Sequence, residues 1–304
     1  MTMPDEYLQY PHRRAGMDQS FYEHSRLFER PAQAWPGGAP VALWITVHFD
    51  FFPMDTQPGP VSPIGGMEFA YPDYRVFTWR DYGNRVGAYR VMKVLRKHNL
   101  KASAVFNSAV AERYPRLLAD VLAAGWEVIA GGVDMGRPLH GRLEAAEEIA
   151  IIDESLSTLR RMSGQPVRTW HSPAHSESFD TLHRLRERGV LHVADWVNDD
   201  MPYRMNTRHG AMLSLPLASE WADDYLMSQQ HMTPPQYQRQ CMDAFTALKA
   251  EAATRGGRVL SLPLHPWIIG QPHRIATLDH LLGDILKAQD TWSATAEDLA
   301  THFR

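Results

Sequence analysis

Short apolar segments rich in β-branched residues alternate with longer amphipathic segments through most of this 304-residue chain. A strand buried on both faces is indicated at 41–48, and a long helix at 143–162, where Ile149, Ile152 and Leu156 lie on one stripe. Strands that alternate with helices pair in parallel through crossover connections, either in a doubly wound sheet or in a barrel. The alternation therefore predicts an α/β fold.

The predicted elements form about seven βα units. Strands are expected at 41–48, 102–107, 127–130, 167–171, 192–194, 212–215 and 259–264, and helices at 84–97, 115–124, 143–162, 180–187, 235–253, 275–288 and 296–302. A dinucleotide-binding sheet would carry G-x-G-x-x-G after its first strand, but HFDFFPMD stands there. The pattern favours a barrel over residues 41–304, preceded by an arm over residues 1–40. The irregular segment 51–78 is expected to cover the site.

Charge, hydropathy and missing motifs exclude several classes of protein. There are 31 Lys and Arg residues against 35 Asp and Glu residues, without a basic run, so nucleic acid is not an expected partner. No apolar run approaches the ~20 residues of a membrane helix, and the first thirty residues lack a signal sequence, so we expect a cytoplasmic protein. The nucleophile elbow, the phosphate-binding loop and the common zinc motifs are also missing from the sequence.

Polar and titratable side chains follow most of the predicted strands. They are His48, Asp50, Asn107, Asp134, His140, His171, His175, Asp195, Asn198, Asp199, Asp200, Glu220 and His265. A single histidine in such a position is more often structural than catalytic. In a parallel barrel, however, the carboxyl ends of all strands meet at one face, where active sites lie. The sequence therefore predicts a titratable ring at this face.

Five segments together resemble the polysaccharide deacetylase (NodB-homology) superfamily, and within it the allantoinase-like and cyclic imidase-like hydrolases. They are VALWITVHFD at 41–50, RDYGNRVGAYRVMKVLRKH at 80–98, AAGWEVIAGG at 123–132, DWVNDDMPY at 195–203 and LPLHPWIIGQPHR at 262–274. The resemblance covers roughly residues 35–300. It implies a distorted (β/α) barrel of about seven parallel strands and hydrolysis of a C–N bond in an amide, imide or ureide.

The resemblance also implies roles for individual residues. Asp50 aligns with the general base of the family, and His265 with the histidine that commonly protonates the leaving nitrogen. Where metal-dependent relatives carry a second carboxylate and two histidines, this chain has Phe51, Gly131 and Met135. None of these three can ligate a hard divalent cation. We therefore expect a hydrolase that uses no metal and no cofactor.

A small cyclic amide, imide or ureide is the expected substrate, because a strained ring has an electrophilic carbonyl. The other expected pocket residues are His48, Asn107, Asp134, His140, His171, His175, Asn198, Asp199 and Glu220. Related proteins are often dimers or tetramers, so a homo-oligomer is expected.

Two alternatives to a metal-independent hydrolase stay open. One is a hydrolase with a metal site rebuilt from His48, Asp50, Asp134, His140 and His265, which offer nitrogen and oxygen ligands. The other is a lyase, an isomerase or a ligand-binding protein on the same fold.

Overall fold

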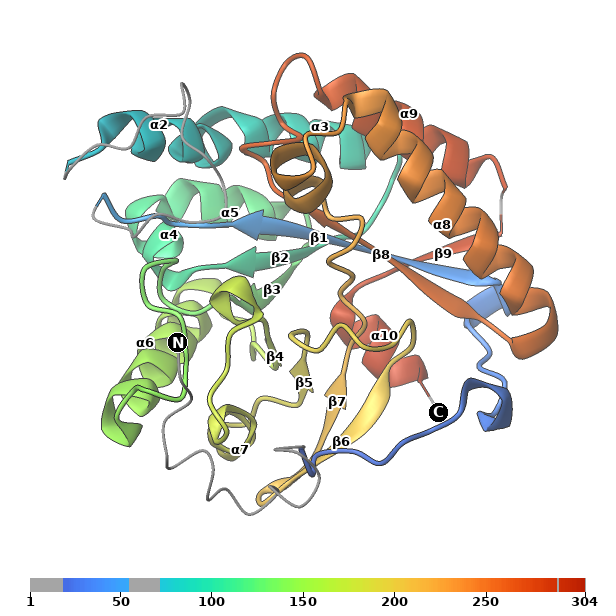
Figure 1. The fold of residues 1–304 in the computed structure, drawn as a ribbon. Helices are drawn as coiled ribbons and strands as arrows, with labels where there is room; N and C mark the ends of the chain where they lie inside the picture. Colours follow the sequence, from blue (N-terminus) through green and yellow to red (C-terminus); the bar gives the residue numbers. More distant parts are fainter. Residues whose placement is uncertain (1–18, 55–71, 289, 304) are drawn as a thin grey trace.

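The computed structural model describes residues 19–54, 72–288 and 290–303, which form one curved sheet with helices around it (Figure 1). The strands are β1 (Val41–Phe49), β2 (Ser103–Phe106), β3 (Glu127–Ala130), β4 (Thr169–Trp170), β5 (His192–Val193), β6 (Tyr203–Thr207), β7 (Gly210–Ser214), β8 (Arg258–Leu264) and β9 (Thr291–Ala294). Their order is β6-β7-β5-β4-β3-β2-β1-β8, with β9 beside β1. All pairs are parallel except β6–β7. The predicted α/β fold on a parallel sheet is confirmed, and the curled sheet is a half-barrel.

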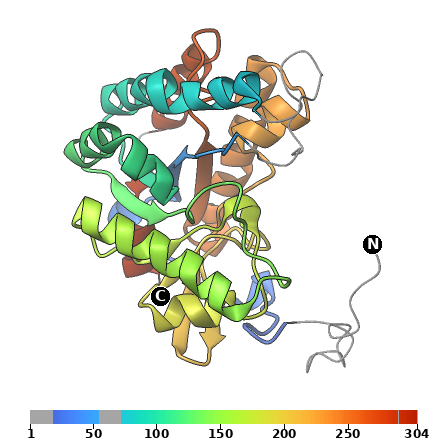
Figure 2. The same cartoon turned by 90° about the vertical axis from the view of Figure 1, so that its left-hand side faces the viewer.

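Helices α3, α5 and α6 follow one another along the outer side of this sheet (Figures 1 and 2), whereas α10 packs with Ala42 and Trp44 of β1 inside the curve. The helices are α2 (Tyr74–Tyr82), α3 (Ala88–Lys97), α4 (Ser108–Arg113), α5 (Pro115–Ala123), α6 (Ala145–Ser163), α7 (Thr181–Glu187), α8 (Pro234–Arg255), α9 (Ile275–Leu286) and α10 (Ala296–His302). Local signals set several of their ends. Thr233 and Thr295 form capping boxes before α8 and α10, and Gly164 ends α6 with a φ of 69°. No helix in the described ranges combines the length and apolar character needed to cross a membrane.

Strand β1 pairs with β2, β8 and β9 and divides its side chains between two faces of the sheet. All nine of its residues are buried. Leu43 and Ile45 belong to the core shared with the outer helices, whereas Ala42 and Trp44 belong to a second cluster inside the curved sheet. Successive side chains of a strand point to opposite faces, so His48 continues the inner row. The inner face thus becomes polar where the strand ends.

Several parts of the structure differ from the predicted elements. The helix expected at 84–97 begins already at Tyr74, because Asp73 accepts hydrogen bonds from the backbone N–H groups of Arg75 and Val76. The segment expected to be irregular at 51–78 therefore ends in a helix, and its residues 55–71 lie outside the described part. Strands β6 and β9 were not predicted, since most residues of both are only partly buried or exposed and form no apolar run. The short helix α4 was not predicted either.

The described part of the N-terminal arm, residues 19–40, packs on the sheet. Phe21 contacts the rings of Trp196 and His183, and the Trp35 indole donates to the Arg258 carbonyl at 2.9 Å. Figure 1 shows this segment passing close to the β6–β7 hairpin. Its contacts place it away from the carboxyl end of β1.

Candidate active site

A cavity of about 820 Å³ lies at the carboxyl ends of the parallel strands. Seven of the predicted site residues line it: His48, Asp50, Asn107, Asp134, His171, His175 and His265. They come from β1 and from the segments after β2, β3, β4 and β8. A cavity of this size matches the pockets that enclose small molecules.

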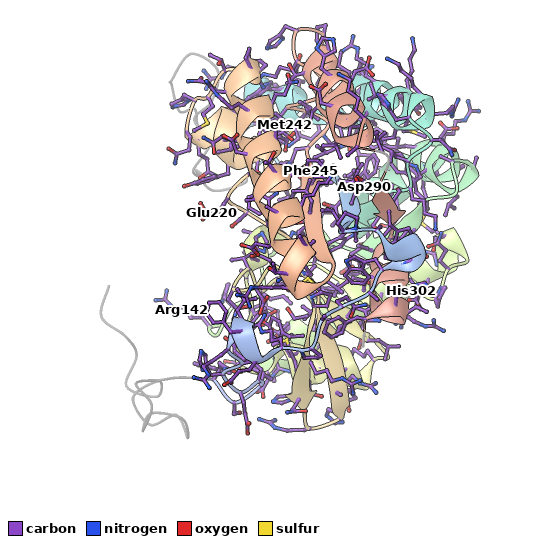
Figure 3. The ribbon with its side chains drawn as sticks, turned by 90° about the vertical axis from the view of Figure 1, so that its right-hand side faces the viewer. Arg142, Glu220, Met242, Phe245, Asp290 and His302 are labelled. Atoms are coloured by element: carbon purple, nitrogen blue, oxygen red, sulfur yellow. The ribbon has the colours of Figure 1, made fainter. Side chains whose placement is uncertain are left out.

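Four other predicted pocket residues do not line this cavity. His140 is exposed, and its Nδ1 accepts from the backbone N–H of Arg142 at 3.2 Å. Glu220 is also exposed, at the outer edge of the molecule near α8 (Figure 3). Ser219 and Ala222, on either side of Glu220, do line the cavity, so at this position the side chain alone lies outside it.

Asn198 and Asp199 lie instead against the N-terminal arm. The Asn198 amide donates to the Tyr22 hydroxyl at 2.6 Å, and Asp199 pairs with Arg30 at 2.6 Å. Both line a second cavity that is formed with the arm. Strand β5 ends at Val193, and by Asn198 the chain has turned away from the strand ends. These side chains position the arm.

His265, directly after β8, is held by a buried carboxylate. Its backbone N–H donates to both Asp223 oxygens, at 3.0 and 2.9 Å, and its Nδ1 lies 2.7 Å from Oδ1 of Asp223. Asp224 Oδ1 lies 3.6 Å from the same ring nitrogen. The proton on Nδ1 is therefore fixed towards Asp223. Nε2 has no partner among the described residues.

The charges around His265 keep it protonated. Burial lowers the pKa of the ring, but Asp224, Asp223 and Asp50 outweigh this effect and raise the pKa to about 10. His265 is thus an imidazolium at neutral pH. Asp223 was missed in the sequence, although the adjacent acids of WADDY, before β8, could have indicated it.

Asp50 is held by its backbone at the end of β1. The Asn84 side chain donates to the Asp50 carbonyl at 3.0 Å, and the next N–H, of Phe51, donates to Asn107 at 2.8 Å. Burial raises the pKa of the Asp50 carboxyl, with His265 acting in the opposite direction. The raised pKa makes the Asp50 carboxylate a stronger base than an exposed aspartate.

The ring of His48 lies between the rings of His265 and His171. It stacks on His265 at a centroid distance of 4.5 Å and meets His171 edge-on at 5.3 Å, and its Nε2 lies 3.0 Å from the Thr46 hydroxyl. Burial and the charge of His265 lower its pKa well below the usual range. His48 is therefore neutral.

His171 and His175 present similar faces to the cavity. Nδ1 of His171 lies 3.0 Å from the Asp195 carboxylate, and Nδ1 of His175 lies 3.2 Å from the Asp195 backbone carbonyl. Both partners are acceptors, so both rings carry their proton on Nδ1 when neutral. Each Nε2, which has no partner in the described part of the chain, is then a hydrogen-bond acceptor. Burial and His171 lower the pKa of His175 to about 4.

Behind these rings, the carboxyl groups of Asp195 and Glu177 lie within hydrogen-bonding reach of each other. Oδ2 of Asp195 is buried and has no hydrogen-bond partner among the described residues. Two carboxyl groups can hydrogen-bond only if one is protonated. Burial and the charge of Asp195 raise the pKa of Glu177 well above its usual range, which identifies Glu177 as the protonated partner.

Variants of Glu177 test this protonation. Glu177→Gln still offers a donor to Asp195 and an acceptor to the Trp196 indole, which lies 3.2 Å from both Glu177 oxygens. We expect its free energy of unfolding to stay within about 0.5 kcal/mol of the wild type, whereas Glu177→Ala should lose about 1–3 kcal/mol by leaving a buried oxygen unpaired. Urea unfolding at neutral pH measures both. Equal losses in the two variants would contradict a protonated Glu177.

The RDYGNRVG segment places α2 and α3 against the loop that follows His265. A Cβ at Gly87 would lie 2.0 Å from the Pro266 carbonyl oxygen, and one at Gly83 would lie 2.6 Å from the Trp267 backbone nitrogen. Only glycine allows backbones to approach this closely. The Gly83–Gly87 turn is π-helical and so fixes the position of this loop beside the cavity.

The three residues that the sequence resemblance places at metal-ligand positions do not fit a metal ion. The Phe51 ring packs on Phe77, and Met135 offers only a thioether. Gly131 has no side chain, and a Cβ there would lie 3.0 Å from the Phe106 backbone. Within the described residues, two other groups bring three nitrogen or oxygen ligand atoms within 4.8 Å: His171 with His175 and Asp195, and His265 with Asp223 and Asp224.

Comparisons with known proteins agree with this architecture. The family described as polysaccharide deacetylase matches residues 73–193. A putative polysaccharide deacetylase of Schizosaccharomyces pombe is 24% identical over 237 residues, which cover 72% of this chain and 73% of that protein.

Two solved structures have a similar fold. A probable polysaccharide deacetylase from Pseudomonas aeruginosa PAO1 has a TM-score of 0.82 at 23% identity, and PuuE allantoinase has 0.83 at 22%. Each comparison covers 92% of this chain and 97% of the other. The chain therefore has the fold of these two structures, and the matched family model lies within it.

Proposed function

We propose that this chain, which contains a polysaccharide deacetylase domain of the NodB-homology type, is a metal-independent hydrolase of small cyclic amides, imides or ureides. Asp50 is the general base and His265 the general acid. One observation carries the proposal: both groups line one cavity, and their surroundings keep the histidine protonated while making the carboxylate more basic.

The reaction needs one proton transfer at each of these groups. Asp50 removes a proton from water, and the oxygen of that water attacks the ring carbonyl. The tetrahedral intermediate then collapses, the C–N bond breaks, and the leaving nitrogen takes the proton from Nε2 of His265. Ring opening yields one N–H group and one carboxylic acid, which releases its proton to solvent, and the proton on Asp50 is returned to His265 through solvent.

The neutral His175 favours a ring that carries an N–H group. Its pKa is lowered to about 4, so its Nε2 is an acceptor, and this atom has no partner among the described residues. Imides and ureides carry N–H donors beside the carbonyl that is attacked, and these can satisfy such acceptors. A polysaccharide chain would also need an open groove, whereas this cavity has the volume of a small-molecule pocket.

Hydrolysis in excess chelator tests the independence from metal. A panel of succinimides, hydantoins and dihydropyrimidines is followed by ultraviolet absorbance after dialysis against EDTA and dipicolinate. We expect turnover to stay within about twofold of the untreated protein, because the acid and the base are both protein side chains. If turnover is lost and Zn²⁺ or Mn²⁺ restores it, the proposed independence from metal is wrong.

A metal-dependent hydrolase is the second candidate, and the cluster of His171, His175 and Asp195 favours it. Their ligand atoms lie within 4.8 Å of one another beside the cavity, and an H-x-x-x-H spacing connects the two histidines. Under this candidate, the purified protein holds one ion per chain, and the double variant His171→Asn, His175→Asn does not. Elemental analysis of both proteins separates the two functions.

A further inference from the structure

Arg80, near the end of α2, is a buried cation that forms no ion pair with any described residue, although the charge of Asp50 in the same cavity acts on it. Its side chain lines the central cavity together with Asp50, and the residue is only 8% exposed. No described residue forms a hydrogen bond or an ion pair with the guanidinium, and the enclosed Nε has no partner. Phe52 supports it from one side, because Cζ lies 3.9 Å from the centroid of that ring.

Leaving such a group unpaired is unfavourable. A guanidinium keeps its charge at all accessible pH values, and a buried charge is costly unless it is paired. The other cations of the cavity have partners: Arg137 pairs with Asp134 at 2.8 Å and with Glu154 at 3.1 Å, and His265 pairs with Asp223. Arg80 is thus the exception among the cavity's described cations, and its free N–H groups are available to a ligand.

We infer that Arg80 binds a carboxylate of the substrate, so that the natural substrates are cyclic amides, imides or ureides whose ring carries a carboxylate group. This inference rests on the proposed function and specifies its substrate class. A guanidinium offers two parallel N–H groups that match the two oxygens of a carboxylate. Its stacking on Phe52 fixes the plane of that fork.

The charges of the cavity favour a carboxylate over a phosphate. Asp50, Asp134 and Asp224 also line it, so a dianion would meet three acidic side chains. A monoanion on Arg80 is balanced by one guanidinium. When the carboxylate is bound to Arg80, the substrate ring itself can contact Asp50, His265 and the imidazole acceptors.

The test compares binding of two probes that differ only in charge. Hydantoin-5-acetate and hydantoin-5-acetamide are titrated calorimetrically into the full chain carrying Asp50→Asn, which prevents turnover of either probe. We expect this protein to bind the carboxylate roughly 10- to 100-fold more tightly, as a charged bidentate contact predicts. Adding Arg80→Gln should remove the preference, and Arg80→Lys should retain only part of it, because lysine keeps the charge but loses the fork.

Controls separate this effect from a general loss of charge or of folding. Arg137→Gln removes a cavity cation that already has partners, and we expect the preference to change by less than about twofold. Thermal unfolding verifies that each variant is folded. Equal affinity for the two probes, no binding of the carboxylate at millimolar concentration, or a preference that survives Arg80→Gln would overturn the inference.

Turnover by the wild-type chain separates this inference from the proposed function. Hydrolysis of neutral rings without any carboxylate preference would overturn the Arg80 subsite and leave the hydrolase in place. A carboxylate preference that depends on Arg80, without hydrolysis of any ring, would support the subsite and overturn the hydrolase.

Discussion

Asp50→Asn is expected to lower kcat/KM for ring hydrolysis by about 10³-fold, with most of the loss in kcat. The asparagine amide has nearly the same shape, but it cannot accept a proton from the attacking water. Its backbone contacts, from Asn84 to the carbonyl and from Phe51 to Asn107, do not involve the carboxylate and should persist. Steady-state kinetics with the best substrate of the panel measures the loss.

Asp134→Asn is the matched control for this substitution. Asp134 lines the same cavity, but one oxygen accepts from the Gly136 N–H at 2.9 Å and the other from Arg137 at 2.8 Å. Because both oxygens are already bound, we expect its kcat/KM to fall less than about tenfold. An Asp50→Asn enzyme that keeps full turnover would exclude Asp50 as the base.

The central part of the site could be predicted because it depends on local patterns. The run 41–48 is apolar on both faces, which indicates a central strand, and the two-residue period places His48 and Asp50 on its inner face. Parallel pairing then brings the ends of β2, β3, β4 and β8 to the same side. Asn107, Asp134, His171, His175 and His265 reach the cavity for this reason.

The remaining part depends on tertiary contacts that no local pattern encodes. Asp223 follows β7 in a loop with a π-helical turn, and only the packed structure brings it under His265. The pKa of Glu177 is raised by burial and by the charge of Asp195, which lies on another loop. Conversely, Asn198 and Asp199 follow a strand in sequence but are drawn to the arm by Tyr22 and Arg30.

Replacing His265 by asparagine should lower kcat by about 10²- to 10⁴-fold, because the leaving nitrogen then departs without a proton donor. In the wild type, hydrolysis needs the protonated form of His265 and the ionised form of Asp50. Activity should therefore fall on the alkaline side as pH rises through about 10, where His265 loses its proton. On the acid side it should fall as Asp50 is protonated, at a pH above the ordinary pKa of an aspartate, because burial raises this pKa.

Asp223→Asn provides the more specific test of the acid, since it leaves the imidazole in place. It removes one of the negative charges that raise the pKa of His265, so the alkaline limb of the kcat/KM profile should move to lower pH. Asp224→Asn removes a charge that also acts on His265, at 3.6 Å, but it leaves the 2.7 Å hydrogen bond from Nδ1 to Asp223 in place.

Both substitutions should therefore shift the limb in the same direction, and only Asp223→Asn should also reduce the plateau by about 10²-fold through misorientation of the ring. An alkaline limb that stays in place in both variants would mean that His265 is not the group that titrates there. The proton for the leaving nitrogen would then have to come from another donor, and His48, which stacks on His265, would be the first to replace.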